Sequence, residues 1–383
     1  MKYRPLFAGV LCTLCVALLG GCENVLTPEE EPRTNSPVLL EDVARLLACV
    51  PLEAEQMQEV HDAACESVAN GYDEEYRMRD LFGQPGSGVG AQTRASSYKR
   101  PLRELLREAA YATKAVGLDN PDAWLEALSG SDVQIYWPFS EAWDGSALPV
   151  ITFDPGDDMP ENEGYALAAD GSVKKVLVTE QMAKEQPVWV VNRNDDAAYQ
   201  TLEMLRRQDP SWGSGGGDIV VTKGGQELQT LVLRTFTSHR QFDSWFAGAS
   251  EFWVKLGAVE NFTASTEAEL RLYEPSITDF MIVVRRSQVD EALPFNAVLV
   301  SEWTGQLANC ALMILEDDGG TQTTWKCSAT VKYNSKSYGF EIELPLRTRD
   351  DIVWRGSLTR NYIERNSGKL GHFGDVDLVL ELI

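Results

Sequence analysis

The spacing of hydrophobic positions changes three times along the chain, and each spacing predicts a different kind of element. The first is an uncharged apolar run over residues 6–19, preceded by Lys2 and Arg4 and followed by Gly20-Gly21-Cys22. A short positive start, an apolar run and small residues are the three parts of a secretory signal. The run is shorter than the roughly 20 apolar residues that a membrane-spanning helix needs. We therefore expect residues 1–21 to be a signal peptide.

Helical spacing begins after this N-terminal run. Apolar residues recur every three or four positions over residues 38–70, and Pro51 interrupts them. Because proline removes a backbone N–H donor and clashes within a helix, we expect two helices with a turn near residues 50–53. A third helix is expected over residues 101–116, where leucine and alanine share one face.

Two segments have the composition of connections. Residues 23–37 contain three prolines and the run Glu29-Glu30-Glu31, so they cannot bury enough apolar surface to order themselves. We expect them to form a tether. Residues 211–217, with the sequence SWGSGGG, are rich in glycine and predict a flexible joint between domains.

After residue 122 short runs of β-branched and aromatic residues predict strands. An acidic loop is expected over residues 154–164 and a short helix over residues 197–207. From residue 218 to the end, about nine or ten short strands with glycine and asparagine turns predict an antiparallel sandwich. The clearest expected strands are 132–139, 148–153, 173–178, 187–192, 231–236, 251–257, 280–286, 310–315, 325–331, 340–344 and 375–382.

Two features of the sequence resemble known lipoproteins. Leu19-Gly20-Gly21-Cys22 resembles the lipobox of bacterial lipoproteins, which implies cleavage before Cys22 and acylation of that cysteine. The segments GYDEEYRMRDLF (71–82), PGSGVG (85–90) and IYWPFSEAWDG (135–145) look like parts of uncharacterised envelope lipoproteins from Bacteroidota-type bacteria. That similarity implies no catalytic residue. It implies a lipid-anchored protein of the cell envelope, which we expect at the outer membrane, on either the periplasmic or the surface face.

These elements together predict an α+β chain. We expect a mainly helical N-terminal segment, a mixed middle region and a C-terminal antiparallel β-sandwich, with modules of the C2 type as one candidate. The expected boundaries are 1–21 for the signal peptide, 22–37 for the lipidated tether, 38–120 for the helical region, 121–210 for the mixed region and 218–383 for the sandwich.

The net charge limits the partners. Without Lys2 and Arg4, 32 basic residues face 58 acidic ones, a net charge of −26. Such a surface repels nucleic-acid phosphates and anionic lipid headgroups. We therefore expect no nucleic-acid partner, and membrane attachment through the lipid on Cys22 alone. The remaining partner is expected to be a protein or a glycan.

Four cysteines remain after the signal peptide and Cys22 are set aside. Asp318-Gly319 is a strong signal for a two-residue hairpin turn, and that register places Cys310 opposite Cys327. The pair falls on a non-hydrogen-bonded site, where the Cα atoms lie about 4.5 Å apart, within the range of a disulfide. We expect this disulfide; the alternative is two free thiols and a longer loop.

The other two cysteines leave more alternatives open. A simple helical hairpin keeps Cys49 and Cys65 apart, because Cys65 lies about 20 Å along a helix from the turn. Whether they pair is left undecided. His61 and Cys65 have the i, i+4 spacing of metal ligands, but no third or fourth ligand is evident. We expect both to be buried structural residues.

Clusters of aspartate raise the question of calcium, which binds six to eight oxygens. Sandwich modules of the C2 type gather aspartates from separate loops, whereas no segment has the EF-hand pattern. The expected ligands, if calcium binds, are the sandwich residues Asp317, Asp318, Asp350 and Asp351; a further cluster is Asp154, Asp157 and Asp158. The alternative for each cluster is a solvated acidic loop, and no other cofactor is expected.

Signatures of catalysis are scarce. The sequence contains no GxSxG elbow and no HExxH helix, and only three histidines. Trp245, Phe252 and Trp253 have the chemistry to stack on a sugar, although aromatic residues in strands are usually core. The leading hypothesis is a non-catalytic envelope lipoprotein that binds a partner. The alternative is a glycan- or peptide-directed hydrolase that uses acidic residues, which are too numerous for a pair to be chosen.

Overall fold

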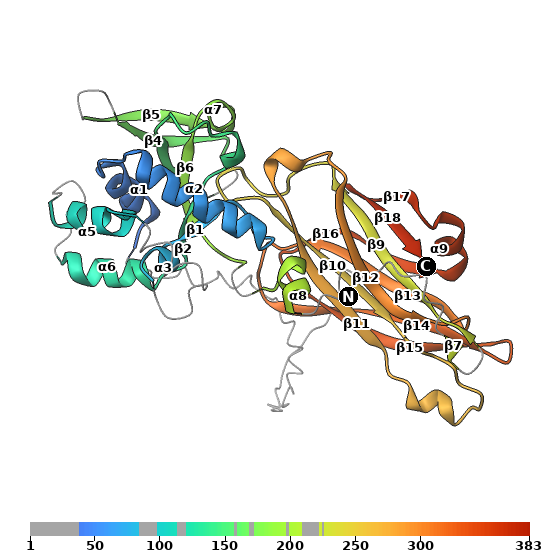
Figure 1. Ribbon diagram of the computed structural model, residues 1–383. Coiled ribbons are helices and arrows are strands. Elements are labelled where there is room, and N and C mark those ends of the chain that lie inside the picture. Colours follow the sequence, from blue (N-terminus) through green and yellow to red (C-terminus); the bar gives the residue numbers. More distant parts are fainter. Residues whose placement is uncertain are drawn as a thin grey trace, which may run out of the picture. The chain divides into compact units, whose positions relative to one another are not determined.

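Helices and a mixed sheet occupy the N-terminal half of the chain, and antiparallel sheets occupy the C-terminal half (Figure 1). The computed structural model describes residues 38–83, 98–112, 120–156, 159–167, 172–196, 199–208, 222–223 and 226–383. The expected signal peptide, Cys22, the tether and the joint at 211–217 lie outside these ranges. Within the described ranges no helix combines the length and the apolarity required to cross a bilayer.

The two N-terminal helices form where the apolar spacing predicts them, one on each side of Pro51. Gln56 accepts a hydrogen bond from the Glu53 N–H and so caps the second helix. A further helix, absent from the prediction, starts at Pro121, where the Asn120 side chain accepts the Ala123 N–H. The helices of this half are α1 (Leu40–Ala48), α2 (Ala54–Ala69), α3 (Met78–Leu81), α5 (Leu102–Ala112), α6 (Pro121–Ser129), α7 (Glu180–Glu185) and α8 (Leu202–Gln208).

One six-stranded sheet runs through this half in the order β1-β2-β6-β3-β4-β5. β3 and β6 are parallel and every other pair is antiparallel. The prediction missed β1, and it was wrong to extend the acidic loop to residue 164, because β4 begins at Glu161. The strands are β1 (Glu75–Arg77), β2 (Val133–Tyr136), β3 (Val150–Phe153), β4 (Glu161–Leu167), β5 (Val173–Thr179) and β6 (Val188–Arg193).

A single core joins α1, α2, α3, α5 and α6 to one face of the sheet. Leu46 and Leu47 of α1, Leu106 of α5 and Trp189 of β6 are completely buried in it. Because this core contains residues on both sides of residue 120, the expected division between a helical region and a mixed region is not present in the structure. The two regions are one folded layer of helices on a sheet.

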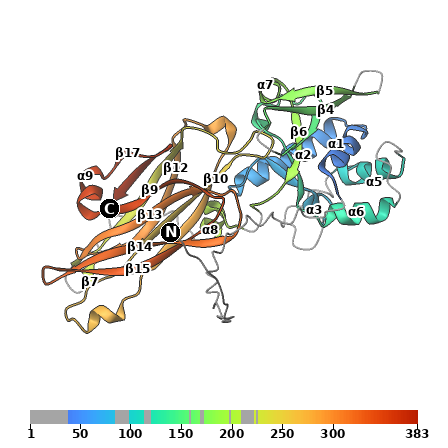
Figure 2. The ribbon, with the colours of Figure 1, turned by 180° about the vertical axis from the view of Figure 1, so that it is seen from behind.

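The C-terminal half is an antiparallel β-sandwich, as predicted (Figure 2). One sheet has the order β11-β10-β13-β14-β15, with β16 also paired to β13, and the other has the order β12-β9-β18-β17. The strands are β9 (Gln229–Ser238), β10 (Ser250–Ala258), β11 (Ser276–Val284), β12 (Leu293–Trp303), β13 (Leu307–Glu316), β14 (Gln322–Tyr333), β15 (Lys336–Arg347), β16 (Asp351–Thr359), β17 (Lys369–Phe373) and β18 (Val376–Leu382). Helix α9 (Arg360–Asn366) contacts β16, β17 and β18. A short two-stranded ribbon, β7 (Thr222–Lys223) with β8 (Gln226–Glu227), precedes the sandwich.

The predicted hairpin and its disulfide are wrong. Most of β13 is a central strand paired with β10 on one side and β16 on the other, so β14 meets it only at Leu307 and Asn309. Cys310 consequently lies opposite Leu358, and Cys327 lies opposite Ile342. Both thiols are free, as are those of Cys49 and Cys65. Asp318-Gly319 does lie in a turn, since Gly319 has a φ of 76°. This turn belongs to a longer loop, in which the Gly319 carbonyl accepts the Arg349 N–H.

Candidate functional site

The predicted calcium ligands lie in the loop after β13 and at the start of β16. These residues are Asp317, Asp318, Asp350 and Asp351. Asp317 accepts hydrogen bonds from Arg347 (3.3 Å) and from the Trp253 Nε1–H (3.3 Å). Asp350 accepts the backbone N–H of Arg347 at 2.6 Å. Arg347 and Trp253 therefore already satisfy carboxylate oxygens that a cation would need.

Three other carboxylates meet next to this loop. Asp243 lies between β9 and β10, Glu251 is the second residue of β10, and Glu316 is the last residue of β13. Each offers one oxygen, and these oxygens lie within 4.8 Å of one another. Among the described residues this is the one group of three or more side chains with the spacing of metal ligands. We call it the carboxylate cluster.

The strands fix the position of the cluster. Glu316 pairs with Phe252 across the ladder between β13 and β10, and the Asp317 N–H donates to the Glu251 carbonyl at 3.1 Å. The loop that carries Asp243 is held by Arg286, whose guanidinium donates to the Asp243 carbonyl (2.8 Å) and to the Gly248 carbonyl (3.1 Å). The three carboxylates therefore have little freedom to separate.

The electrostatics of the cluster are unfavourable without a proton or a cation. Glu316 is fully buried, and burial, together with the Asp243 carboxyl, raises its pKa to about 11. Burial likewise raises the pKa of Asp243 to about 7 and that of Glu251 well above its ordinary value. Two carboxylate charges at this spacing repel by on the order of 3 kcal/mol at an effective dielectric constant near 20.

A second group of buried acids lies in the N-terminal half and is satisfied differently. Asp73 accepts the Ala249 N–H at 2.8 Å, Glu74 accepts the Ser140 N–H at 3.2 Å, and Glu75 accepts the Asn194 amide at 2.8 Å. Burial raises the pKa of each of the three carboxyl groups. Each of these acids nevertheless has a hydrogen-bond donor.

The three histidines lie apart from the carboxylate cluster. His61 packs against Trp137 and Trp143, with ring centroids 5.7 and 5.2 Å away, and its ring nitrogens lie 3.8 Å from the Cys65 sulfur. The expectation that both residues are buried is wrong, because Cys65 is exposed and His61 is half-buried. No further metal-type ligand joins this pair among the described residues. His239 and His372 both contact Asp377, at 3.1 and 2.5 Å.

An aromatic hollow of about 170 Å³ lies between the segment after β2 and helix α7. Trp137, Phe139 and Trp143 line one side, and Lys184 lies 5.7 Å from the centroid of the Phe139 ring. Phe139 has a φ of 60° and a ψ of 31°. The left-handed region is unfavourable for a bulky residue, and such strain clusters at functional sites. The remaining lining residues are Ala142, Asp144, Ala147, Ala183, Glu185, Gln186 and Pro187.

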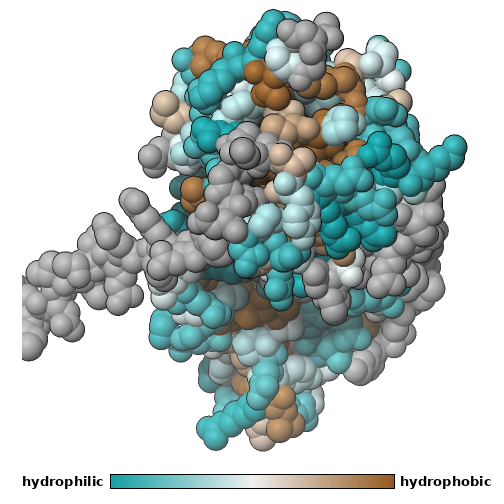
Figure 3. All heavy atoms as spheres, turned by 90° about the vertical axis from the view of Figure 1, so that its left-hand side faces the viewer, coloured by the Kyte–Doolittle hydropathy of each residue, from teal (hydrophilic) through white to brown (hydrophobic). Residues whose placement is uncertain are grey.

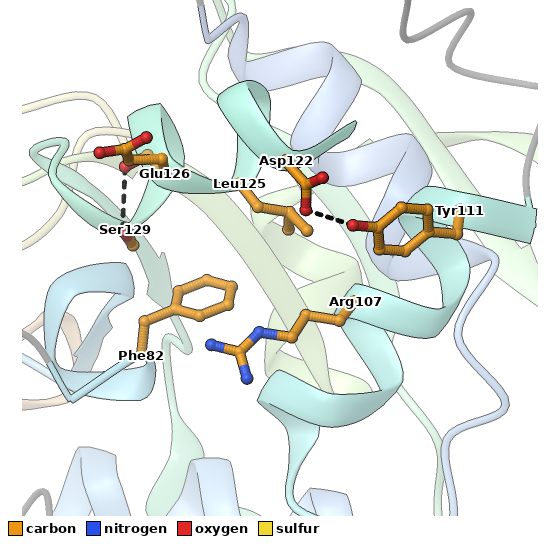
Figure 4. A pocket seen from close by; sticks show the side chains of 7 residues that line it. All are labelled: Phe82, Arg107, Tyr111, Asp122, Leu125, Glu126 and Ser129. Atoms are coloured by element: carbon orange, nitrogen blue, oxygen red, sulfur yellow. Dashed lines mark hydrogen bonds between the residues drawn. The ribbon is translucent and has the colours of Figure 1, made fainter. Parts of the chain in front are cut away.

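A larger cavity of about 270 Å³ lies between α5 and α6 (Figure 4). Two of its polar side chains already donate hydrogen bonds: Tyr111 donates to the Asp122 carboxylate, and Ser129 donates to the backbone carbonyl of Glu126. The Arg107 guanidinium lies 5.6 Å from the centroid of the Phe82 ring, within the range of about 6 Å for a cation–π contact.

Hydrophobic side chains are also exposed on the side that carries β4, β5 and α7. Figure 3 shows hydrophilic residues over the middle of this face and hydrophobic residues gathered in its upper part. Leu167 of β4 and Leu177 of β5 are among the exposed large hydrophobic residues of the described chain. By contrast, Trp245 and Phe252, which the sequence offered as sugar-stacking candidates, are buried in cores.

One signal in the sequence pointed to Glu316, a member of the carboxylate cluster that the prediction missed. Leu312, Ile314 and Glu316 alternate along β13, and their partners Leu256, Val254 and Phe252 all belong to the sandwich core. An acid that continues an inward-facing alternation is a polar group placed where a hydrophobic one is expected. The adjacent Asp317-Asp318 attracted the prediction instead. No local signal marks Asp243 or Glu251.

No protein-family model, no curated protein and no solved structure matches the chain. The fold and the site therefore define its class: an α+β chain with a C-terminal antiparallel β-sandwich, a buried carboxylate cluster and an aromatic hollow.

Proposed function

We propose that this chain is a lipid-anchored protein of the bacterial cell envelope, that it acts by binding a partner, and that the aromatic hollow is the binding site. The observation that carries the binding role is the hollow itself, with aromatic rings on one side and the strained Phe139 in its wall. Concave sites lined by aromatic residues with a few polar groups are typical of ligand pockets.

The anchor is proposed from the sequence. Leu19-Gly20-Gly21-Cys22 has the form of a lipobox, and the net charge of −26 after processing favours attachment through acyl chains over attachment through headgroups. The outer membrane is the proposed location, because the similar lipoproteins belong to bacteria with a two-membrane envelope.

The size and chemistry of the hollow indicate what it binds. A volume of about 170 Å³ accommodates one sugar ring or one large side chain. The half-buried Trp143 ring can stack on either group, and Lys184 and Asp144 can hydrogen-bond its polar substituents. A glycan or a peptide of an envelope protein is therefore the proposed partner.

The hydrolase alternative gains no support from the carboxylate cluster. Glu316 is fully buried, so a glycosidic or peptide bond cannot approach its carboxylate. In the larger cavity the Asp122 carboxylate is engaged by the Tyr111 hydroxyl. Neither arrangement resembles two carboxyl groups facing each other across an open cleft.

Replacing Cys22 tests the anchor. We expect Cys22→Ser to move the protein from the membrane fraction to a soluble or unprocessed form and to abolish labelling by a fatty-acid analogue. Cys12→Ser, a change inside the signal peptide, is the matched control and should leave both readouts unchanged. A cleaved Cys22→Ser protein that still requires detergent for extraction would rule out the lipid anchor.

Replacing Trp143 tests the hollow. The soluble Cys22→Ser protein is applied to an array of envelope glycans and to an array of envelope-protein peptides. We expect binding on one array that Trp143→Ala abolishes and that Tyr111→Ala, an aromatic change in the other cavity, retains. Binding that survives Trp143→Ala places the site elsewhere, and no binding on either array counts against the binding role.

A further inference from the structure

We propose that Asp243, Glu251 and Glu316 bind one calcium ion in the sandwich, at a site separate from the aromatic hollow and from the predicted ligands. The inference goes beyond the proposed partner binding and does not depend on it. It rests on the arrangement of three carboxylates and on buried oxygens of Glu316 and Asp243 that accept no hydrogen bond from the part of the chain that the structure describes.

The geometry supplies the first argument. Oxygens of the three side chains lie within 4.8 Å of one another, which is close enough for one cation to contact all three. Two of the residues are on the hydrogen-bonded neighbours β10 and β13, and Arg286 holds the loop of the third through its carbonyl. The folded chain therefore holds the three acidic side chains at a spacing that one cation can bridge.

The second argument is the state of the buried oxygens. Glu316 is fully buried, and within the described residues neither of its oxygens accepts a hydrogen bond from a donor. The same holds for the buried Oδ2 of Asp243. The neighbouring buried acid Asp73 shows the usual solution, because it accepts the Ala249 N–H at 2.8 Å. Native proteins pair almost all their buried polar groups, so these oxygens require either a proton shared between the Glu316 and Asp243 carboxyl groups or a bound cation. A cation has the advantage that it can contact all three carboxylates at once.

The chemistry of the donors selects calcium. All three side chains offer hard oxygen atoms, which suit calcium, magnesium and manganese, and the cluster contains no sulfur or imidazole ligand. Magnesium is usually bound by only one or two carboxylates and retains several waters, whereas calcium accepts six to eight oxygens in a flexible shell. Water and backbone carbonyl oxygens would complete the coordination.

Calcium binding is measured on the soluble full-length Cys22→Ser protein after treatment with EDTA. Equilibrium dialysis with radioactive calcium should give one bound ion per chain. Thermal melts should shift to higher temperature with millimolar calcium, because a ligand of the native state stabilises it, and less with the same concentration of magnesium. Dialysis without bound calcium, or melts that superimpose in calcium, magnesium and EDTA, would overturn the proposal.

Two variants and a control assign the ligands. Glu316→Gln, and independently Asp243→Asn in the partly exposed loop, should weaken calcium binding by at least about tenfold, the loss that even an outer-shell partner causes. Asp351→Asn changes an exposed acid opposite Glu316 in the ladder and should bind calcium as the parent protein does. If Glu316→Gln fails to fold, the calcium binding of Asp243→Asn alone tests the site. Calcium binding that Asp351→Asn weakens and Asp243→Asn leaves intact would place the ion in the loop cluster and contradict this site.

Discussion

Hydrogen bonds from single side chains determine how far the buried acids of this protein are compensated for the loss of water. The Asn194 amide donates to Glu75 at 2.8 Å, to Gln134 at 2.9 Å and to Asp196 at 2.7 Å, so one residue supports two buried acids. A carboxyl that shares a donor in this way is only partly compensated for the loss of water. The consequence at the residue scale is a dependence of stability on pH.

Asp196 shows in which direction the free energy of unfolding changes with pH. Its side chain is 3% exposed, and burial, followed by the charge of Asp195, raises its pKa to about 7 from an unfolded value near 3.9. The folded state therefore holds the proton more tightly than the unfolded chain, and the free energy of unfolding falls as pH rises through the window from about 4 to about 7. The contribution is fully present below the unfolded pKa and is lost above the folded one.

The Asp196→Asn variant should lose the contribution of Asp196 to the pH dependence of the free energy of unfolding. Urea unfolding at pH 5 and pH 8 in EDTA should show that the parent protein loses more stability over this range than the variant, by up to about 3 kcal/mol, since each pH unit inside the window is worth about 1.4 kcal/mol per proton. Asp144→Asn is the control, because Asp144 is exposed and hydrogen bonds with Ser146 lower its pKa. Equal slopes for Asp196→Asn and the parent protein would contradict the prediction.

At the scale of elements, the strands of the N-terminal sheet pack closely enough to exclude even one methyl group. A Cβ added to Gly164 of β4 would overlap the Val178 side chain and lie 2.9 Å from the Ile151 carbonyl oxygen. Val178 belongs to β5 and Ile151 to β3, so Gly164 sets the approach of both neighbouring strands. Its role is close contact and not an unusual backbone angle.

Gly164→Ala should accordingly destabilise the protein. We expect the free energy of unfolding to fall by about 1–3 kcal/mol, the usual cost of overpacking, as measured by urea denaturation. Gly339→Ala on β15 is the matched control, since a Cβ there meets nothing within 4 Å, and its effect should stay within about 0.5 kcal/mol. A Gly164→Ala protein as stable as the control variant would show that β4 and β5 can move apart.

At the scale of the whole molecule, the chain from residue 36 to residue 383 is one compact unit with more than one core. A small third core lies on the second face of the N-terminal sheet. It contains Tyr136, Val188 and Val190 of the sheet together with Trp245 and Phe246, which come from the loop before β10 of the sandwich. The same loop carries Asp243, so the packing of this core and the position of one member of the carboxylate cluster are connected through the backbone.

Phe246→Ala should weaken the molecule as a whole. Phe246 is fully buried, and truncating such a side chain typically costs about 3–5 kcal/mol. We expect a loss of that size in urea denaturation, and separate unfolding steps for the two halves when fluorescence and circular dichroism are compared. Leu272→Ala, at a leucine that is 78% exposed, should change stability by less than about 0.5 kcal/mol. A loss below about 1 kcal/mol for Phe246→Ala would mean that this core contributes little to holding the halves together.

The sequence by itself determined the elements whose signals are local. Pro51 separated α1 from α2, alternating and β-branched runs marked β2, β3, β5, β6 and most strands of the sandwich, and glycine turns indicated an antiparallel arrangement. Each of these features depends on neighbouring residues alone, through backbone geometry or through the period of apolar side chains. The α+β class and the sandwich followed from their order along the chain.

Only the tertiary structure decided which strands and acids meet. A turn signal at Asp318-Gly319 could not reveal that β10 and β16 already occupy both edges of β13, and so the partners of Cys310 and Cys327 were misassigned. The carboxylate cluster has the same origin, because Asp243 and Glu316 are 73 positions apart in the sequence and meet only through the pairing of β10 with β13 and the contacts that Arg286 makes with the loop before β10. Contacts between distant residues depend on the competition among all possible strand partners, and that competition is settled by burial of the whole core and leaves no local pattern in the sequence.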